Sequence, residues 1–155
     1  MKIKLSVLAG FIILIDLATK TIVQNTMELY QSIDVIEGFF SIMYLRNTGA
    51  AWSILEGQKA FFIVVSSAVC TILLKTFIKE KEDPIILAGL AVMFAGAFGN
   101  LFDRVVHGYV RDMLAFNIFG YDFPVFNIAD VSLVIGVGLI ALAVIIEERR
   151  SKSNA

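Results

Sequence analysis

The sequence predicts an integral membrane protein, an all-α bundle of four transmembrane helices with a small β-rich segment between the first two. Two observations predict this class. Hydrophobic residues make up 58% of the 155 residues and charged residues 17%, and the mean hydropathy is +0.82, which is not typical of a soluble domain. The apolar residues also gather into four runs, each near the about 20 residues that a helix needs to cross a bilayer.

The four apolar runs give the predicted spans. These are residues 5–23, 60–78, 85–102 and 129–146. The first follows Lys2 and Lys4, as in a secretory signal, but it continues through Asp16 and Lys20 without a small-residue cleavage site, so we interpret it as an uncleaved anchor. No linker of biased composition separates the runs, and we expect a single domain over residues 1–155.

Basic residues predict the orientation of the bundle. They flank the first run, the turn between the second and third, and the end of the fourth: Lys2 and Lys4; Lys75, Lys79 and Lys81; Arg149, Arg150 and Lys152. All three clusters fall on one side, which the positive-inside rule makes cytoplasmic. We therefore expect both termini in the cytoplasm, and residues 24–59 and 103–128, which hold the polar motifs, on the outer side.

The segment after the first span has the composition of short strands. Residues 32–45 mix β-branched and aromatic side chains with partial period-two alternation, and Gly38 suits a turn or bulge. We expect a small sheet at the lipid surface within residues 28–57. Residues 46–53 then pass from polar to small side chains and reach Trp52, which is expected at the membrane interface.

Acidic residues at the ends of the last two spans are the main indication of function. Asp103 and Asp112 follow the third span, and Asp130 opens the fourth. A charge near hydrocarbon costs several kcal/mol unless it is paired, hydrated or neutralised, so such acids indicate a functional site. The only cation beside Asp112 is Arg111, and adjacent residues do not face each other. Asp112 can therefore face another acid and share a proton with it.

Several polar residues near these acids also have structural explanations, which the sequence leaves open. Asp16 and Lys20 are four residues apart on one helix face, where they can form an ion pair or act on a substrate. Asn100, Asp103 and Arg104 are spaced for one face of a helical turn. We expect Asp103 to pair with Arg104 as a structural acid, and Asn100 to form hydrogen bonds across the bundle.

Asp130 has two interpretations. It lies three residues after Asn127 on the same predicted face, where the helix N-terminus favours a carboxylate, or it is only an N-cap, a position that Asp favours. Other chemistries have little support. His107 is the single histidine, which argues against a histidine triad or a zinc site, and Cys70 lies in an apolar run where packing explains it.

Two other functional classes are consistent with a multi-span protein. In an ion- or proton-coupled transporter, intramembrane acids would carry protons or bind a cation, but these acids cluster at one face and no internal repeat is visible. A purely structural subunit gives no reason for so many polar groups at one face. The net charge of -1 and the dispersed basic residues do not suggest nucleic-acid binding.

Four motifs, taken together, resemble the lipoprotein signal peptidases (signal peptidase II) of bacteria. They are DLATK at 16–20, NTGAAW at 47–52, GNLFDR at 99–104 with GYVRD at 108–112, and FNIAD at 126–130. The resemblance covers almost the whole chain in the right order. By this resemblance Asp112 and Asp130 match the catalytic aspartates. The positions that shape and support the site match Asp16, Lys20, Asn47, Gly49, Asn100, Asp103, Arg104, Asn127 and Ala129.

The resemblance implies a small extracytoplasmic β-cradle and an aspartyl endopeptidase of the bacterial cytoplasmic membrane, monomeric and without metal or cofactor. It implies cleavage of diacylglyceryl prolipoproteins on the amino side of the lipidated cysteine, contact with membrane lipids, and inhibition by globomycin. The chain departs from the family pattern at Trp52, where phenylalanine is expected, and at residues 111–114, where Arg-Asp-Met-Leu replaces Val-Asp-Phe-Ile. If Arg111 and Asp112 meet, we expect Arg111 to lower the pKa of Asp112.

Overall fold

The computed structural model describes residues 1–49, 57–80 and 83–153, and these ranges contain four helices and four strands. The helices are α1 (Lys2–Thr26), α2 (Lys59–Lys79), α3 (Pro84–Val106) and α4 (Ile128–Ser153). The strands are β1 (Ser32–Ile36), β2 (Phe40–Asn47), β3 (Val110–Ile118) and β4 (Tyr121–Phe126). Trp52 and Lys81 lie outside the described residues.

Each helix covers a predicted span and extends past both of its ends. All four are long and apolar enough to cross a membrane, with mean hydropathies from 1.9 to 2.6. Local signals agree with the helix boundaries. At the start of α3 the Asp83 side chain accepts hydrogen bonds from the N–H groups of Ile85 and Ile86, and Pro84 occupies the first helical position. The predicted four-helix membrane fold is confirmed.

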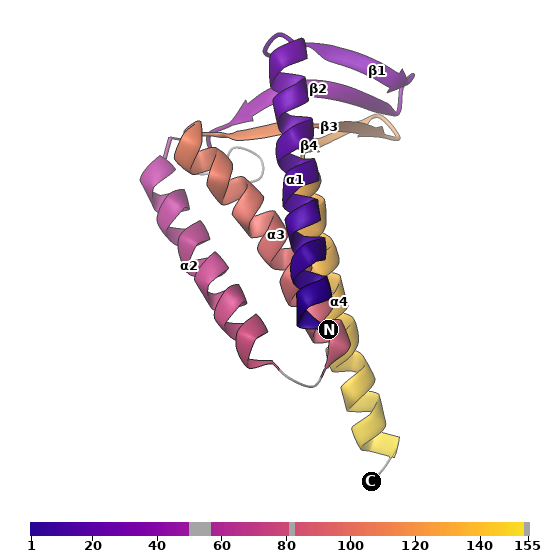
Figure 1. The fold of residues 1–155 in the computed structure, drawn as a ribbon. Coiled ribbons are helices and arrows are strands. Elements are labelled where there is room, and N and C mark those ends of the chain that lie inside the picture. The colour runs from indigo at the N-terminus through magenta and orange to yellow at the C-terminus, as the bar shows by residue number, and fades with distance from the viewer. Residues whose placement is uncertain (50–56, 81–82, 154–155) are drawn as a thin grey trace.

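The sheet caps one end of the bundle (Figure 1). The start of α1, the end of α2, the start of α3 and the end of α4 lie toward the other end (Figure 1). The C-terminal end of α3 and the start of α4 lie beside the sheet, because β3 follows α3 and β4 precedes α4 along the chain. The polar motifs at residues 99–104 and 126–130 are therefore near the sheet.

α3 is the most buried helix of the bundle. In its membrane-spanning segment 56% of the residues are buried, whereas in the other three helices the share is 17% to 22%. Small residues let α1 and α4 approach it closely. A Cβ atom on Gly96 would overlap the carbonyl oxygen of Ala129, and one on Gly99 would lie 2.5 Å from Asp16 Oδ2. The backbones of three helices are thus close together just below the polar end of α3.

Polar and apolar side chains are distributed in the opposite way to a soluble protein. Large apolar residues cover the outer faces of the helices, where 73% of Val134, for example, is exposed. Several charged side chains are instead at most 2% exposed: Asp16, Lys20, Asp103, Arg111 and Asp112. Lipid can cover the apolar faces, whereas a charge needs partners inside the protein.

The sheet is antiparallel in the order β1-β2-β3-β4. The strands predicted within residues 32–45 are present as β1 and β2, with Gly38 between them at a φ of 69° that favours glycine. No strands were predicted for residues 110–126, yet β3 and β4 form half of the sheet. Pro124 lies in β4, an edge strand, where proline is tolerated.

The pairing of β2 with β3 brings two distant motifs together. Leu45 is paired with Asp112, and Asn47 with Val110. Because alternate residues of a strand share a face, Asn47 and Asp112 are diagonal neighbours on the same side of the sheet. Arg111 lies on the opposite side of the sheet.

Candidate active site

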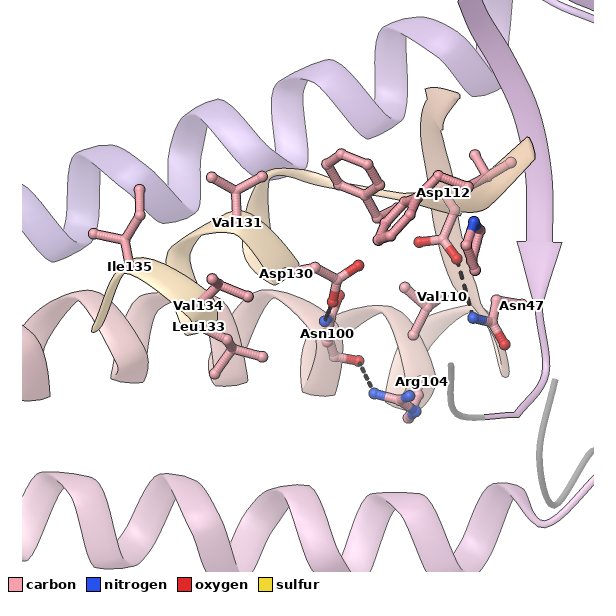
Figure 2. Close-up of a pocket in the computed structure, with 14 residues that line it drawn as sticks. Asn47, Asn100, Arg104, Val110, Asp112, Asp130, Val131, Leu133, Val134 and Ile135 are labelled. Atoms are coloured by element: carbon pink, nitrogen blue, oxygen red, sulfur yellow. Dashed lines mark hydrogen bonds between the residues drawn. The ribbon is translucent and has the colours of Figure 1, made fainter. Parts of the chain in front are cut away.

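Asp112 and Asp130 line one cavity of about 560 Å³ beside the sheet and the start of α4. Asp112 comes from β3 and Asp130 from the first turn of α4. Both carboxyl groups project into the same space (Figure 2). The cavity is also lined by Asn47, Asn100 and Arg104. The fold therefore brings together the two acids implied by the family resemblance, although they are 18 positions apart along the chain.

Asp130 belongs to a reciprocal capping arrangement at the start of α4. Asn127 precedes the first helical residue, and its Oδ1 accepts a hydrogen bond from the Asp130 N–H at 3.0 Å. In return Asp130 Oδ2 accepts from the Asn127 N–H at 3.2 Å. The cap position thus belongs to Asn127. Asp130 Oδ1 accepts from Asn100 Nδ2 at 2.7 Å, so the carboxyl group is oriented by bonds to both of its oxygens.

Asp112 is 2% exposed and is held by two asparagine amides. Its Oδ1 accepts from Asn127 Nδ2 at 2.6 Å, and its Oδ2 accepts from Asn47 Nδ2 at 3.1 Å. Burial, followed by the negative charge of Asp130, raises the pKa of Asp112 to about 7, against the lowering effect of the two amides. The condition under which we expected Arg111 to lower this pKa is not met, because the two side chains lie on opposite sides of the sheet.

Asn127 connects the two carboxyl groups directly. Its side-chain amide donates to Asp112, and its backbone N–H donates to Asp130. The same amide donates to Asn100 Oδ1 at 3.2 Å, and Asn100 in turn donates to Asp130. Two asparagines thus fix the relative position of the two acids.

The prediction that Asp103 pairs with Arg104 is wrong. Asp103 Oδ1 accepts from Arg111 Nη2 at 2.6 Å, and Asp103 Oδ2 accepts from the Arg111 backbone N–H at 2.9 Å. The physical reason is helical geometry. Residues 103 and 104 are adjacent, so their side chains diverge around the helix. Asp103 faces α1 and β3, where Lys20 also lies 3.6 Å from its Oδ2.

Arg104 lines the cavity instead. Its guanidinium donates to the carbonyl oxygens of Asn100, at 3.4 Å, and of Gly49, at 3.3 Å, and it lies 5.0 Å from the centre of the Phe62 ring. Arg104 therefore links the end of α3 to the chain after β2. It also brings a positive charge to the cavity that holds the two acids.

The predicted ion pair of Asp16 and Lys20 is present, with Lys20 Nζ 2.8 Å from Asp16 Oδ2. Lys20 also donates to Asn100 Oδ1 at 3.1 Å. Asp16 Oδ1 accepts from the backbone N–H of Ala129 at 2.9 Å. This buried pair therefore supports Asp130 from two sides. Lys20 holds Asn100, which bonds the Asp130 side chain, and Asp16 holds the backbone of Ala129, the preceding residue.

Beyond the acids, the cavity has apolar walls. One wall is the outer face of α4, formed by Val131, Leu133, Val134 and Ile135, and the other is the end of β4, residues 123–126. The α4 residues extend away from Asp130 along the helix (Figure 2). Because Val134 and Ile135 are 73% and 51% exposed, the cavity opens to the side of the bundle, where lipid would lie.

Sequence reasoning missed Arg111 and the β4 wall. Arg111 was weighed only as a neighbour of Asp112, whereas it holds Asp103. The sequence did contain a signal for its role. Arg111 and Asp112 are two adjacent charged residues between the apolar residues Val110 and Met113. Since alternate strand residues point to opposite faces, a strand prediction for residues 110–118 would have placed Arg111 and Asp112 on opposite sides.

A four-helix membrane bundle that holds two carboxyl groups in a laterally open cavity beside its sheet has the architecture of an integral membrane enzyme. Comparison with known proteins gives the family. The sequence model of the family described as Signal peptidase (SPase) II matches residues 8–146. The chain belongs to this family, the lipoprotein signal peptidases, and the resemblance drawn from the four motifs is confirmed.

Individual relatives agree. The lipoprotein signal peptidases of Staphylococcus aureus strains MRSA252 and JH9 are each 42% identical over 148 residues, covering 95% of this chain and 91% of the relative. A solved structure described as a bacterial membrane enzyme, determined by the in meso method at 2.3 Å resolution, is similar with a TM-score of 0.87 and 43% identity, covering 92% of this chain and 88% of that one. A second, at 1.9 Å resolution, has a TM-score of 0.82 and 45% identity, with coverages of 90% and 91%.

Proposed function

We propose that this signal peptidase is an aspartyl endopeptidase that removes the signal peptide from diacylglyceryl prolipoproteins, cutting on the amino side of the lipidated cysteine. The observation that carries the proposal is the position of Asp112 and Asp130 in one cavity, both bonded to Asn127. The similarity to lipoprotein signal peptidases supports the class of substrate.

The reaction begins from a pair of acids that shares one proton. Two neighbouring carboxyl groups ionise together only at high cost, so one of them stays protonated. Burial and the charge of Asp130 raise the pKa of Asp112 to about 7, which favours Asp112 as the holder of this proton. Asp130, bonded to N–H donors at the positive end of a helix, suits the ionised role.

In the first step, Asp130 takes a proton from a water molecule as the water oxygen attacks the scissile carbonyl carbon. Asp112 transfers its proton to the carbonyl oxygen, which stabilises the tetrahedral intermediate. In the second step the carbon–nitrogen bond breaks. The leaving nitrogen takes the proton from Asp130, and Asp112 recovers its own as the carbonyl re-forms. These steps use no metal or organic cofactor.

The surrounding residues keep the two acids in place. Asn47, Asn100 and Asn127 orient the carboxyl groups through their amides. The remaining family positions act indirectly, through the buried ion pairs or through the backbone: Asp16, Lys20, Gly49, Asp103, Arg104 and Ala129. Arg104 has a further role, because its charge lies at the cavity, where it can bind a carbonyl oxygen of the substrate.

The apolar wall of the cavity fits a substrate that arrives through the membrane. A signal peptide is an apolar helix, and the substrate cysteine carries acyl chains, so both would enter sideways along α4. The scissile bond would then lie at the end of α4 beside Asp130. An inhibitor of the globomycin type, implied by the resemblance, would compete for this cavity. We expect the enzyme to act as a monomer among membrane lipids.

The sheet and the acids should face the outside of the bacterial cytoplasmic membrane. Lys2, Lys75 and Lys79 lie at the ends of helices remote from the sheet, and so does the basic C-terminal end of α4 (Figure 1). The positive-inside rule makes that end cytoplasmic. Water would then reach the acids from the outer side.

The test is cleavage of a diacylated prolipoprotein peptide by the purified protein in detergent. We expect the wild-type protein to release the signal peptide and to leave the lipidated cysteine as the new amino terminus, measured by mass spectrometry. Asp112→Asn and Asp130→Asn should each lower the cleavage rate by about 100- to 10,000-fold while remaining folded. An unlipidated peptide should not be cut.

The matched control is Asp34→Asn, because Asp34 is an exposed acid of the same sheet whose side chain bonds only Ser41 among the described contacts. This variant should cleave at the wild-type rate. A transporter would show no cleavage by any variant. Cleavage by a double Asp112→Asn, Asp130→Asn variant at the wild-type rate would disprove the aspartyl mechanism.

A further inference from the structure

Arg111 is buried, at 2% exposure, and contacts two helices from its position on β3. Its Nη2 and Nε donate to Asp103 Oδ1 of α3 at 2.6 and 3.1 Å. Its Nη1 donates to Gln24 Oε1 of α1 at 2.9 Å and to Thr21 Oγ1 at 3.3 Å. One guanidinium thus ties the start of β3 to α1 and α3 together.

Arg111 and Asp112 are adjacent on a strand, so their side chains point to opposite faces of the sheet. Their Cα atoms are only about 3.8 Å apart across a planar peptide bond. The backbone N–H of Arg111 is also fixed, because it donates to Asp103 Oδ2 at 2.9 Å. Because Arg111 is held on the side of the sheet that faces the helices, Asp112 is held on the side that faces the cavity.

The planar fork of arginine is needed for this contact. Nε and Nη2 bond one partner while Nη1 bonds others in the same plane. A lysine would keep the charge but has a single nitrogen, which cannot reach Asp103 on α3 and Gln24 on α1 in the same geometry. The contact with both helices, and not only the charge, would be lost.

We propose that Arg111 is a positioning residue for the aspartate pair, which sets the place of Asp112 in the cavity by fixing β3 to α1 and α3. The proposal rests on the proposed function and adds a residue to it. Arg111 does not line the cavity and does not touch the reacting atoms. Its effect passes through the backbone to Asp112.

The test is Arg111→Lys in the full-length enzyme, assayed with the diacylated peptide. A displacement of about 1 Å can cost on the order of 100-fold in rate, and we expect a loss of kcat of that order with KM within about twofold. The charged groups near Asp112 are Asp130, Lys20 and Arg104. Burial dominates the raised pKa, so an Asp112 that is less enclosed should lose its proton at lower pH. The alkaline limb of the kcat profile should therefore move to lower pH.

The matched control is Arg46→Lys. Arg46 is the cross-strand partner of Arg111 in β2, but it is exposed and its contacts are with Tyr44 and Tyr109. The same substitution there should leave kcat and the pH profile unchanged. A purely structural Arg111 would lower the unfolding midpoint without moving the pH profile of the folded enzyme.

A second variant, Gln24→Leu, applies if Arg111→Lys does not fold. It removes the shorter of the two α1 contacts of Arg111, that with Gln24, and keeps the contacts with Thr21 and Asp103. It should lower kcat and shift the alkaline limb in the same direction, by less. If the variant that folds has the kcat and the pH profile of the wild-type enzyme, the positioning role of Arg111 is wrong, while the proposed function stands. Failure of the wild-type enzyme to cleave the peptide would overturn the proposed function and the positioning role with it.

Discussion

Two groups of charged residues adjoin each other in this molecule and are held in opposite ways. The ion-pair cluster consists of Asp16, Lys20, Asp103 and Arg111. Each of its carboxylates has a cation within 2.8 Å. The acid pair, Asp112 and Asp130, is instead held by asparagine amides and backbone N–H groups. Asn100 contacts both groups, through Lys20 and Asp130.

The difference between the two groups indicates that one holds the elements of the fold together and that the other is suited to proton transfer. In the ion-pair cluster opposite charges cancel, so the cluster can fix α1, α3 and β3 against each other. In the acid pair two like charges form together only at high cost, and under the proposed mechanism one proton is therefore retained and exchanged. Substitutions of Asp16, Lys20 and Asp103 should therefore change mainly stability, and substitutions in the acid pair should change activity. Arg111 belongs to the cluster but also positions Asp112, so its substitution should change both.

The largest effect is expected for Asp112→Asn. General acid–base groups contribute about 100- to 10,000-fold in rate, and we expect a loss of kcat in that range on the diacylated peptide. The unfolding free energy at about pH 8 should be unchanged or higher, because the variant has no ionised carboxyl group in this buried position. A variant that loses stability rather than activity would break the comparison.

The converse is expected for Asp103→Asn in the ion-pair cluster. It leaves Arg111 without its carboxylate, and breaking a buried pair costs about 3–5 kcal/mol. Chemical unfolding in detergent measures this loss. Glu148→Gln is the control, because it breaks the exposed pair with Lys152, which is 2.6 Å away at the end of α4, and should have little effect. Equal effects of the two substitutions would contradict the assignment of the cluster.

Asp112 should make the stability of the protein depend on pH. The pKa of Asp112 rises from 3.8 to about 7 on folding, so the folded protein binds this proton more tightly than the unfolded chain. The stabilisation is complete below about pH 4 and is lost as pH rises to about 7, by a few kcal/mol in total. Unfolding midpoints at about pH 5 and pH 8 test this. A slope of equal size in Asp112→Asn would assign it to other groups.

The sequence was informative wherever a local pattern determined the structure. The apolar runs predicted the four helices, because span length and composition are local properties. The i, i+4 spacing of Asp16 and Lys20 predicted their ion pair. Asp103, Asp112 and Asp130 were singled out because carboxylates are costly near hydrocarbon, and the family resemblance implied Asp112 and Asp130 as the pair. The fold places these two in one cavity.

The sequence was uninformative where partners depend on tertiary pairing. The partner of Asp103 was predicted from chain proximity, whereas Arg111 reaches it only because β3 folds back along α3. The strands in residues 110–126 were missed because polar and charged residues interrupt the alternation of apolar and polar side chains that is typical of a strand. The connection of the two acids through Asn127 depends on the pairing of β3 with β4 and on the capping of α4, which no short window contains.

A smaller effect is expected for Gly99→Ala, at the boundary between the two groups. A Cβ atom there would lie 2.5 Å from Asp16 Oδ2 and 3.3 Å from the Cβ of Ala129, next to Asp130. Overpacking of this kind costs about 1–3 kcal/mol, so we expect a lower unfolding free energy and a smaller loss of kcat than in Asp112→Asn. Gly138→Ala in α4 is the control, because its Cβ would meet nothing within 4 Å and alanine favours a helix. If the two variants were equally stable, α1 and α4 would not be held at Gly99 by close contact, and the two groups could move independently.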